Sequence, residues 1–126
     1  MDKVIEQWLK NKIAHKEIED YLKLEFNIKS IAIYGAGTLG EMLYDDIMQF
    51  GDIEVSYFID KNAESLYYGI DDMNIFSLEE LDTLKKVDMI IVTPYKEYEQ
   101  IKCDLEKKLL YKTNIISLDD IIWKVE

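Results

Sequence analysis

Residues Ile31–Ile47 read IAIYGAGTLGEMLYDDI, and this stretch contains the strand, turn and helix around which the other elements can be placed. Four strand-forming residues, 31–34, run directly into GAGTLG at 35–40, which has the form G-x-G-x-x-G. Apolar residues then recur three and four positions apart as far as Phe50, so a helix is predicted, with Gly51 as its C-cap. The segment predicts the first β–α unit of a nucleotide-binding fold.

Each glycine of the turn has a steric role in that interpretation. Gly35 allows the tight turn, Gly37 lets the backbone approach a pyrophosphate, and Gly40 lets the helix lie close to the strand. Asp60 ends a second predicted strand, 54–60, and follows Gly40 by 20 residues. An acid at this place accepts hydrogen bonds from the ribose hydroxyls of adenosine, although capping of the next turn would also explain it.

The chain outside this unit alternates short strands with helices. The capping box Ser77–Glu80 marks one helix start, and a polar loop with a turn at Gly69 is expected over 61–72. Strands are predicted over 31–34, 54–60, 73–76, 87–93 and 112–117, and helices over 39–50, 77–85, 95–110 and from 117 onwards. This alternation predicts an α/β protein with a three-layer, Rossmann-like parallel sheet of about five strands and right-handed crossovers.

The first residues form an extra helical segment that the nucleotide fold does not require. Two apolar stripes over 2–26 predict one long helix or two short ones, with a break near 11–15 and Asp2 as N-cap. The segment could cover the sheet edge on the same chain or contact a second subunit as a homodimer. We therefore divide the chain into an N-terminal helical segment, 1–28, and a Rossmann-like domain, 29–126.

Length and charge limit the function classes. The 126 residues fit one hydrophobic core, and a formal net charge of −11 argues against nucleic acid as a partner. The single cysteine, Cys103, allows no intrachain disulfide, as in a reducing cytoplasm. No apolar run reaches about 18 residues, and the N-terminus lacks the apolar region of a signal peptide. The expectation is a cytoplasmic protein without a membrane partner.

Several motifs together resemble a known group: IAIYGAGTLGEML, YFID, MNIFSLEEL and VDMIIVT, spread over about residues 30–122. The chain looks like the small Rossmann-type modules at the N-terminus of bacterial nucleotide-sugar acetyltransferases and polysaccharide-biosynthesis sugar dehydratases. This resemblance implies nucleotide-sugar or polysaccharide metabolism, with a pocket for NAD(P), for the nucleotide part of a sugar donor, or for neither. The hexapeptide repeats of the acetyltransferases and the catalytic domain of the dehydratases are absent. The chain is therefore either a stand-alone module or a piece of a longer protein, and a fused or separate catalytic domain is a possible partner.

A catalytic centre is not evident in the sequence. The only histidine, His15, lies in the N-terminal helical segment, and Cys103 has no histidine nearby. Tyr98 and Lys102 have the Y-x-x-x-K spacing of short-chain dehydrogenases but come too early in too short a chain. No His/Cys cluster suits a metal. Three aspartate pairs have ordinary explanations. The pair at 45–46 lies partly on a solvated helix face, the pair at 71–72 lies in a loop, and the pair at 119–120 lies in the first turn of a helix, where acids suit the dipole.

The sequence therefore predicts a nucleotide-binding module without a catalytic centre of its own. NAD is the expected cofactor, with NADP disfavoured by the charge of Asp60, and a nucleotide-sugar is the alternative ligand. A small NAD-dependent oxidoreductase, or an interaction domain that has lost its ligand, stays open as another function. The residues expected to bind the ligand are Gly35, Ala36, Gly37, Thr38, Leu39, Gly40, Asp60, Lys61, Thr93 and Pro94.

Overall fold

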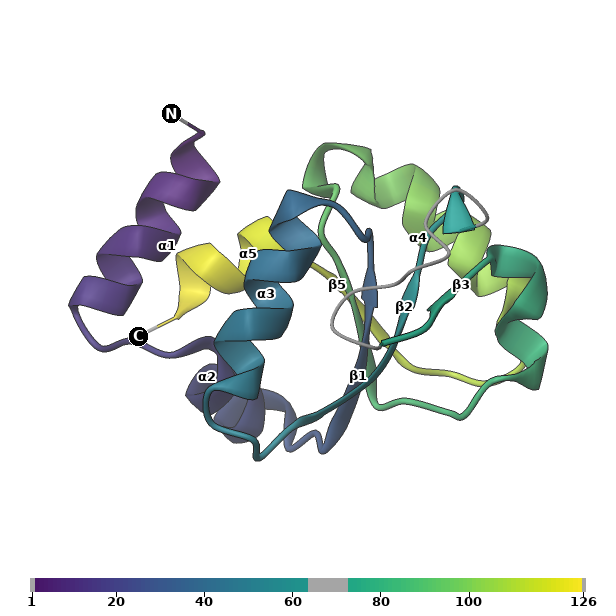
Figure 1. The fold of residues 1–126 in the computed structure, drawn as a ribbon, viewed down its shortest axis with the longest axis horizontal. Helices are drawn as coiled ribbons and strands as arrows, with labels where there is room; N and C mark the ends of the chain where they lie inside the picture. The colour runs from purple at the N-terminus through teal and green to yellow at the C-terminus, as the bar shows by residue number, and fades with distance from the viewer. Residues whose placement is uncertain (1, 64–72, 126) are drawn as a thin grey trace.

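The structure, a computed structural model, describes residues 2–63 and 73–125, and its strands form one parallel sheet (Figure 1). The strands are β1 (Ser30–Tyr34), β2 (Glu54–Ile59), β3 (Ile75–Phe76), β4 (Met89–Val92) and β5 (Asn114–Ser117). Their order across the sheet is β3-β2-β1-β4-β5, and every neighbouring pair runs parallel. The order reverses between β1 and β4, which in such sheets places a crevice beyond the carboxyl ends of the strands. The predicted Rossmann-like α/β class is confirmed.

Helices cover both faces of this sheet (Figure 1). One face is covered by α2 (Ile18–Phe26), α3 (Thr38–Met48) and α5 (Leu118–Lys124), and α1 (Lys3–Ile13) packs outside this layer, against α5. The other packs against η2 (Leu78–Thr83), a 3₁₀-helix, and α4 (Tyr98–Lys108), which follows the 3₁₀ turn η3 (Tyr95–Glu97). Side chains of β1 alternate between the two cores, as a strand buried on both faces requires. No helix in the described part of the chain is long and apolar enough to cross a bilayer.

Several predicted boundaries differ from the structure. The helix predicted over 95–110 is the turn η3 followed by α4, and the one over 77–85 is 3₁₀, although its capping box forms as expected. Helix α3 ends at Met48 with Gln49 as C-cap, so Gly51 as C-cap is wrong. Gly51 instead takes φ +76° in the following turn. The predicted turn at Gly69 and the acids at 71–72 lie outside the described residues.

The N-terminal segment forms two helices, and His15 lies in the turn between them with φ 59°, outside the helix expected for it. The buried face of α1, with Val4 and Trp8, belongs to the same core as Ile121 and Ile122 of α5. The helices therefore pack on their own chain. The homodimer contact through their outer faces stays a prediction.

Buried carboxylates tie this segment to the nucleotide fold. Asp46 of α3 accepts hydrogen bonds from Trp8 Nε1 at 2.7 Å and from Lys12 Nζ at 2.8 Å. Glu19 of α2 accepts the backbone N–H groups of the 52–53 loop at 2.9 and 2.8 Å. Partial burial opposes the charge of Lys12, but its hydrogen bonds to Asp46 and Glu17 raise its pKa. These contacts fix the N-terminal helices against α3 and the start of β2.

Candidate functional site

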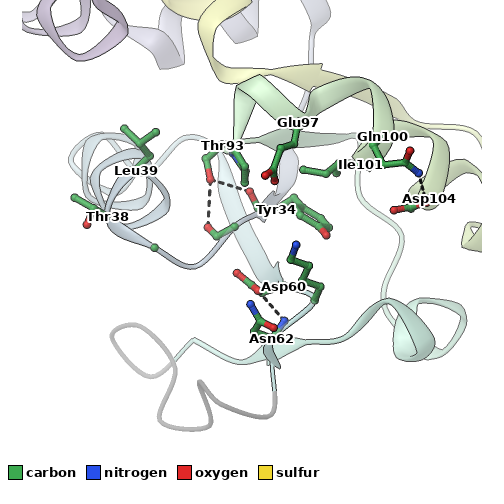
Figure 2. Close-up of a pocket in the computed structure, with 14 residues that line it drawn as sticks. Tyr34, Thr38, Leu39, Asp60, Asn62, Thr93, Glu97, Gln100, Ile101 and Asp104 are labelled. Atoms are coloured by element: carbon green, nitrogen blue, oxygen red, sulfur yellow. Dashed lines mark hydrogen bonds between the residues drawn. The ribbon is translucent and has the colours of Figure 1, made fainter. Parts of the chain in front are cut away.

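A cavity of about 710 Å³ lies at the carboxyl ends of β1, β2 and β4 (Figure 2). It is lined by Tyr34, Gly35, Gly37, Thr38, Leu39, Asp60, Lys61, Asn62, Thr93, Pro94, Glu97, Gln100, Ile101 and Asp104. The structure thus brings the residues predicted for the ligand to one place, except that Ala36 and Gly40 lie beside the cavity without lining it. This is the position at which open α/β sheets bind their ligands.

Gly35 makes the turn after β1. Its φ is +103°, and a Cβ there would lie 2.3 Å from Thr93 Oγ1 and 2.9 Å from Pro94 Cδ. Its N–H donates to the carbonyl oxygen of Ile59 at 2.8 Å, so the turn is anchored to the end of β2. A side chain is excluded at Gly35 by both the backbone conformation and the neighbouring wall.

Asp60 holds the next residue of the loop. Its Oδ2 accepts the Ala36 N–H at 2.9 Å, and its Oδ1 accepts the Asn62 N–H at 2.8 Å. The amide of Ala36 is thereby occupied within the protein and is not directed at a phosphate. A carboxylate has about four acceptor positions, so roughly two remain for hydroxyl groups of a ligand. The loop contact also fixes the orientation of the Asp60 carboxylate.

The amides that follow face open space. Gly37 is the N-cap of α3, and among the described residues no side chain caps this helix. The N–H groups of Gly37, Thr38 and Leu39 find no acceptor in the described part of the chain, as expected for a helix start. A Cβ on Gly37 would meet nothing within 4 Å. Three residues whose N–H groups lack an acceptor in the described chain therefore line the cavity, at the positive end of the helix dipole.

Gly40 has the packing role that the motif predicts. A Cβ built on it would lie 2.0 Å from the carbonyl oxygen of Gly35 and 3.6 Å from Phe58 Cε2. The first turn of α3 can therefore approach the end of β1 only because Gly40 has no side chain. This close approach determines where the free amides lie.

The opposite wall comes from the end of β4 and from α4 (Figure 2). Thr93 donates its hydroxyl to the carbonyl oxygen of Tyr34 at 2.9 Å, which holds β4 and β1 together at the cavity. Glu97, Gln100 and Asp104 also line the cavity, with Gln100 Nε2 donating to Asp104 Oδ1 at 3.0 Å. The sequence interpretation expected Thr93 and Pro94 at the cavity but missed Glu97, Gln100 and Asp104. The spacing of three and four residues between these polar side chains is a signal that could have found them.

Carboxylates outnumber cations around the cavity. Asp60, Glu97 and Asp104 line it together with one lysine, Lys61. Burial raises the pKa of the Tyr34 hydroxyl, and the three carboxylates raise it further. A phosphate group would therefore be bound chiefly by the backbone N–H groups of α3, and an additional phosphate near the carboxylates would be repelled.

Replacing Asp60 with alanine is expected to destabilise the ligand-free protein by about 1 kcal/mol, because the partly buried N–H of Ala36 loses its acceptor. Urea unfolding followed by circular dichroism measures this change. Asp60→Asn is the matched control, since its one carbonyl oxygen can still accept from Ala36 and should retain most of the stability. An Asp60→Ala protein as stable as the wild type would show that the contact does not hold the loop.

The catalytic candidates weighed above lie away from this arrangement. Tyr98 donates its hydroxyl to the carbonyl oxygen of Ile115 at 2.5 Å, and burial raises its pKa, the opposite of what a proton-transferring tyrosinate needs. Cys103 and His15 are exposed, and neither lines the cavity. In the described ranges no three His, Cys, Asp or Glu side chains group as metal ligands.

The sheet order, the glycine turn and the cavity at the strand ends define a Rossmann-like α/β domain. The chain belongs to the C2185-like, N-terminal family, whose model matches residues 27–116. A search of curated proteins found no match. Among solved structures, the chain is similar to UDP-D-quinovosamine 4-dehydrogenase from Vibrio fischeri, at 21% identity and a TM-score of 0.60, covering 79% of this chain and 88% of that one. At this identity the likeness establishes the fold.

Proposed function

We propose that this domain binds a nucleotide-sugar in the cavity at the carboxyl ends of β1, β2 and β4. The diphosphate would accept hydrogen bonds from the N–H groups of Gly37, Thr38 and Leu39, and Asp60 would bind the ribose hydroxyls. Lys61 would contact the base or a phosphate, and Thr93 with Pro94 would form the opposite wall. The observation that carries the proposal is the set of amides at the start of α3 that face open space beside Gly37.

The nucleotide-sugar is favoured over NAD by the similar structure, whose name includes a UDP-sugar. Both ligand classes contain a ribose and a diphosphate, so the same loop and acid could bind either. The carboxylates of Asp60, Glu97 and Asp104 around one lysine disfavour NADP, because its extra phosphate would be repelled. Catalysis, and any role in polysaccharide biosynthesis, would come from a fused or separate domain, since no described residue at the cavity forms an acid–base pair with a nucleophile.

Replacing Gly37 with valine is expected to weaken nucleotide-sugar binding by at least about a hundredfold, which corresponds to roughly 2.7 kcal/mol. The side chain would occupy the space through which the diphosphate approaches the amides, while the backbone, with φ −91° and ψ −158°, accepts a β-branched residue. Isothermal titration with UDP-glucose, UDP-N-acetylglucosamine and NAD on both proteins measures the effect.

Thr38→Val is the matched control for this experiment. It removes the exposed hydroxyl but keeps the N–H group of the same helix turn, so affinity should stay close to that of the wild type. If wild-type protein bound none of the three ligands, the nucleotide-binding proposal would be rejected. Tight binding of NAD without the UDP-sugars would instead favour the dinucleotide alternative.

A further inference from the structure

A second cavity, of about 300 Å³, adjoins the candidate site. It shares Leu39, Thr93, Pro94 and Glu97 with the first cavity and adds Asp2, Tyr95 and Lys96. Figure 2 shows Leu39 and Thr93 on the side of the site away from Asp60 and Asn62. The start of α3 therefore lies between the acid expected to bind ribose and this second cavity.

One wall of the second cavity comes from the N-terminal segment. Asp2 is the N-cap of α1, and its Oδ1 accepts the Val4 N–H at 2.7 Å. Its other carboxylate oxygen accepts a hydrogen bond from the hydroxyl of Tyr95, in the turn that follows β4. This contact raises the pKa of Tyr95 to about 12 and lowers the pKa of Asp2. The second cavity is therefore lined by the carboxylates of Asp2 and Glu97, the hydroxyl of Tyr95 and the ammonium group of Lys96.

These groups fit a ligand part that both donates and accepts hydrogen bonds. Because the two cavities share Leu39 at the start of α3, a group attached to a diphosphate bound there could reach the second cavity. Sugar hydroxyls can donate to Asp2 or to the hydroxyl oxygen of Tyr95, and they can accept from Lys96. Asp2 lies outside residues 27–116, which the family model matches, so only the Asp2 part of this wall is an addition to the common domain.

We propose that the second cavity is the sugar subsite, with Asp2 and Tyr95 contacting the sugar of the bound nucleotide-sugar. This proposal rests on the nucleotide-sugar function given above, and it assigns to the N-terminal helices a part in ligand recognition. The sugar and the nucleotide are then recognised by different parts of the chain. The nucleotide contacts the glycine turn and Asp60, whereas the sugar contacts the cap of α1 and the turn after β4.

The test compares UDP with UDP-N-acetylglucosamine by isothermal titration. The wild type should bind UDP-N-acetylglucosamine on the order of tenfold more tightly than UDP. That difference corresponds to one or two good hydrogen bonds to the sugar. Tyr95→Phe and Asp2→Asn should each remove most of that gain and leave UDP affinity unchanged. Asn is as good an N-cap as Asp, so α1 should remain folded. Tyr57→Phe is the matched control, because its hydroxyl donates to the Lys85 carbonyl at 2.9 Å, away from both cavities.

Saturation-transfer NMR on the same samples gives an independent readout. Sugar ring protons should lose saturation relative to uracil protons in Tyr95→Phe but not in Tyr57→Phe. If the wild type bound UDP and the UDP-sugar with equal affinity, while Gly37→Val still weakened binding of both, the sugar subsite would be overturned and the nucleotide site would stand. Equal weakening of both ligands by Tyr95→Phe would also overturn it, since the residue would then only support the wall. Binding of neither ligand would reject the function and the subsite together.

Discussion

Replacing Gly40 with alanine is expected to destabilise the protein by at least about 3 kcal/mol, at the upper end of the cost of overpacking. The added Cβ would lie 2.0 Å from the carbonyl oxygen of Gly35 and 3.1 Å from its carbonyl carbon. Both are backbone atoms, and the turn that contains them is anchored through the Gly35 N–H to the carbonyl of Ile59. To avoid this clash, α3 would have to move away from β1, and this movement would open the core between them. A protein of ordinary stability would lose a large fraction of its folding free energy.

Urea unfolding followed by circular dichroism measures this effect, and Gly37→Ala is its matched control. The same methyl group three residues earlier meets nothing within 4 Å, and the φ of −91° suits alanine. Alanine is a poorer N-cap than glycine, so the control should lose less than about 1 kcal/mol. Similar unfolding midpoints for the two variants would show that α3 does not depend on the close approach at Gly40.

The second large effect is expected for Asp46→Ala, with a loss of about 3 kcal/mol. The Asp46 side chain is buried and accepts hydrogen bonds from Trp8 Nε1 and from Lys12 Nζ. Its removal leaves a buried indole N–H without an acceptor and a partly buried ammonium group with only Glu17 and Gln49 nearby. Breaking a buried charged pair costs several kcal/mol because the remaining charge stays desolvated. The loss should loosen α1 before the sheet.

Asp45→Ala, the adjacent and exposed position on the same helix, is the matched control and should change stability by less than about 0.5 kcal/mol. Trp123 is 58% exposed, so both variants are best made in a Trp123→Phe background that leaves Trp8 as the fluorescent reporter. In Asp46→Ala the Trp8 emission should shift to the red at lower urea than the circular dichroism transition. If the fluorescence and circular dichroism transitions of Asp46→Ala coincided at the wild-type urea midpoint, Asp46 would not be needed to hold α1 against α3.

Much of the fold was predictable because its signals are local. The glycine turn, the capping box at Ser77 and the apolar run at 89–92 each depend on near neighbours in sequence, and each lies where expected. The hydrogen bond between Asp46 and Trp8 was not predictable, because the sequence at 45–46 indicates only two adjacent acids on a helix. Which acid is buried depends on how α1 crosses α3, a tertiary contact across 38 residues that no local pattern specifies.

The candidate site was predictable in its position and less so in its detail. The motif located Gly35, Gly37 and Asp60 at one edge of the sheet, and the cavity lies there. It did not reveal that Asp60 accepts the Ala36 N–H, because the motif does not specify which amides are already bonded. The wall from α4 was missed because Gln100 and Asp104 lie beside an apolar stripe, and polar residues on a helix do not by themselves indicate a pocket.

The hydrogen bond from Asn11 Nδ2 to the carbonyl of Ile122, at 2.9 Å, joins residues 111 positions apart and has a consequence for biosynthesis. Helix α1 leaves the ribosome well before α5, against which it packs. At a synthesis rate of about 5–20 residues per second, the apolar face of α1 with Val4 and Trp8 stays exposed for roughly 6–20 s before α5 is made. During that interval the nascent chain exposes a hydrophobic helix, which makes this segment the expected target of a holdase chaperone.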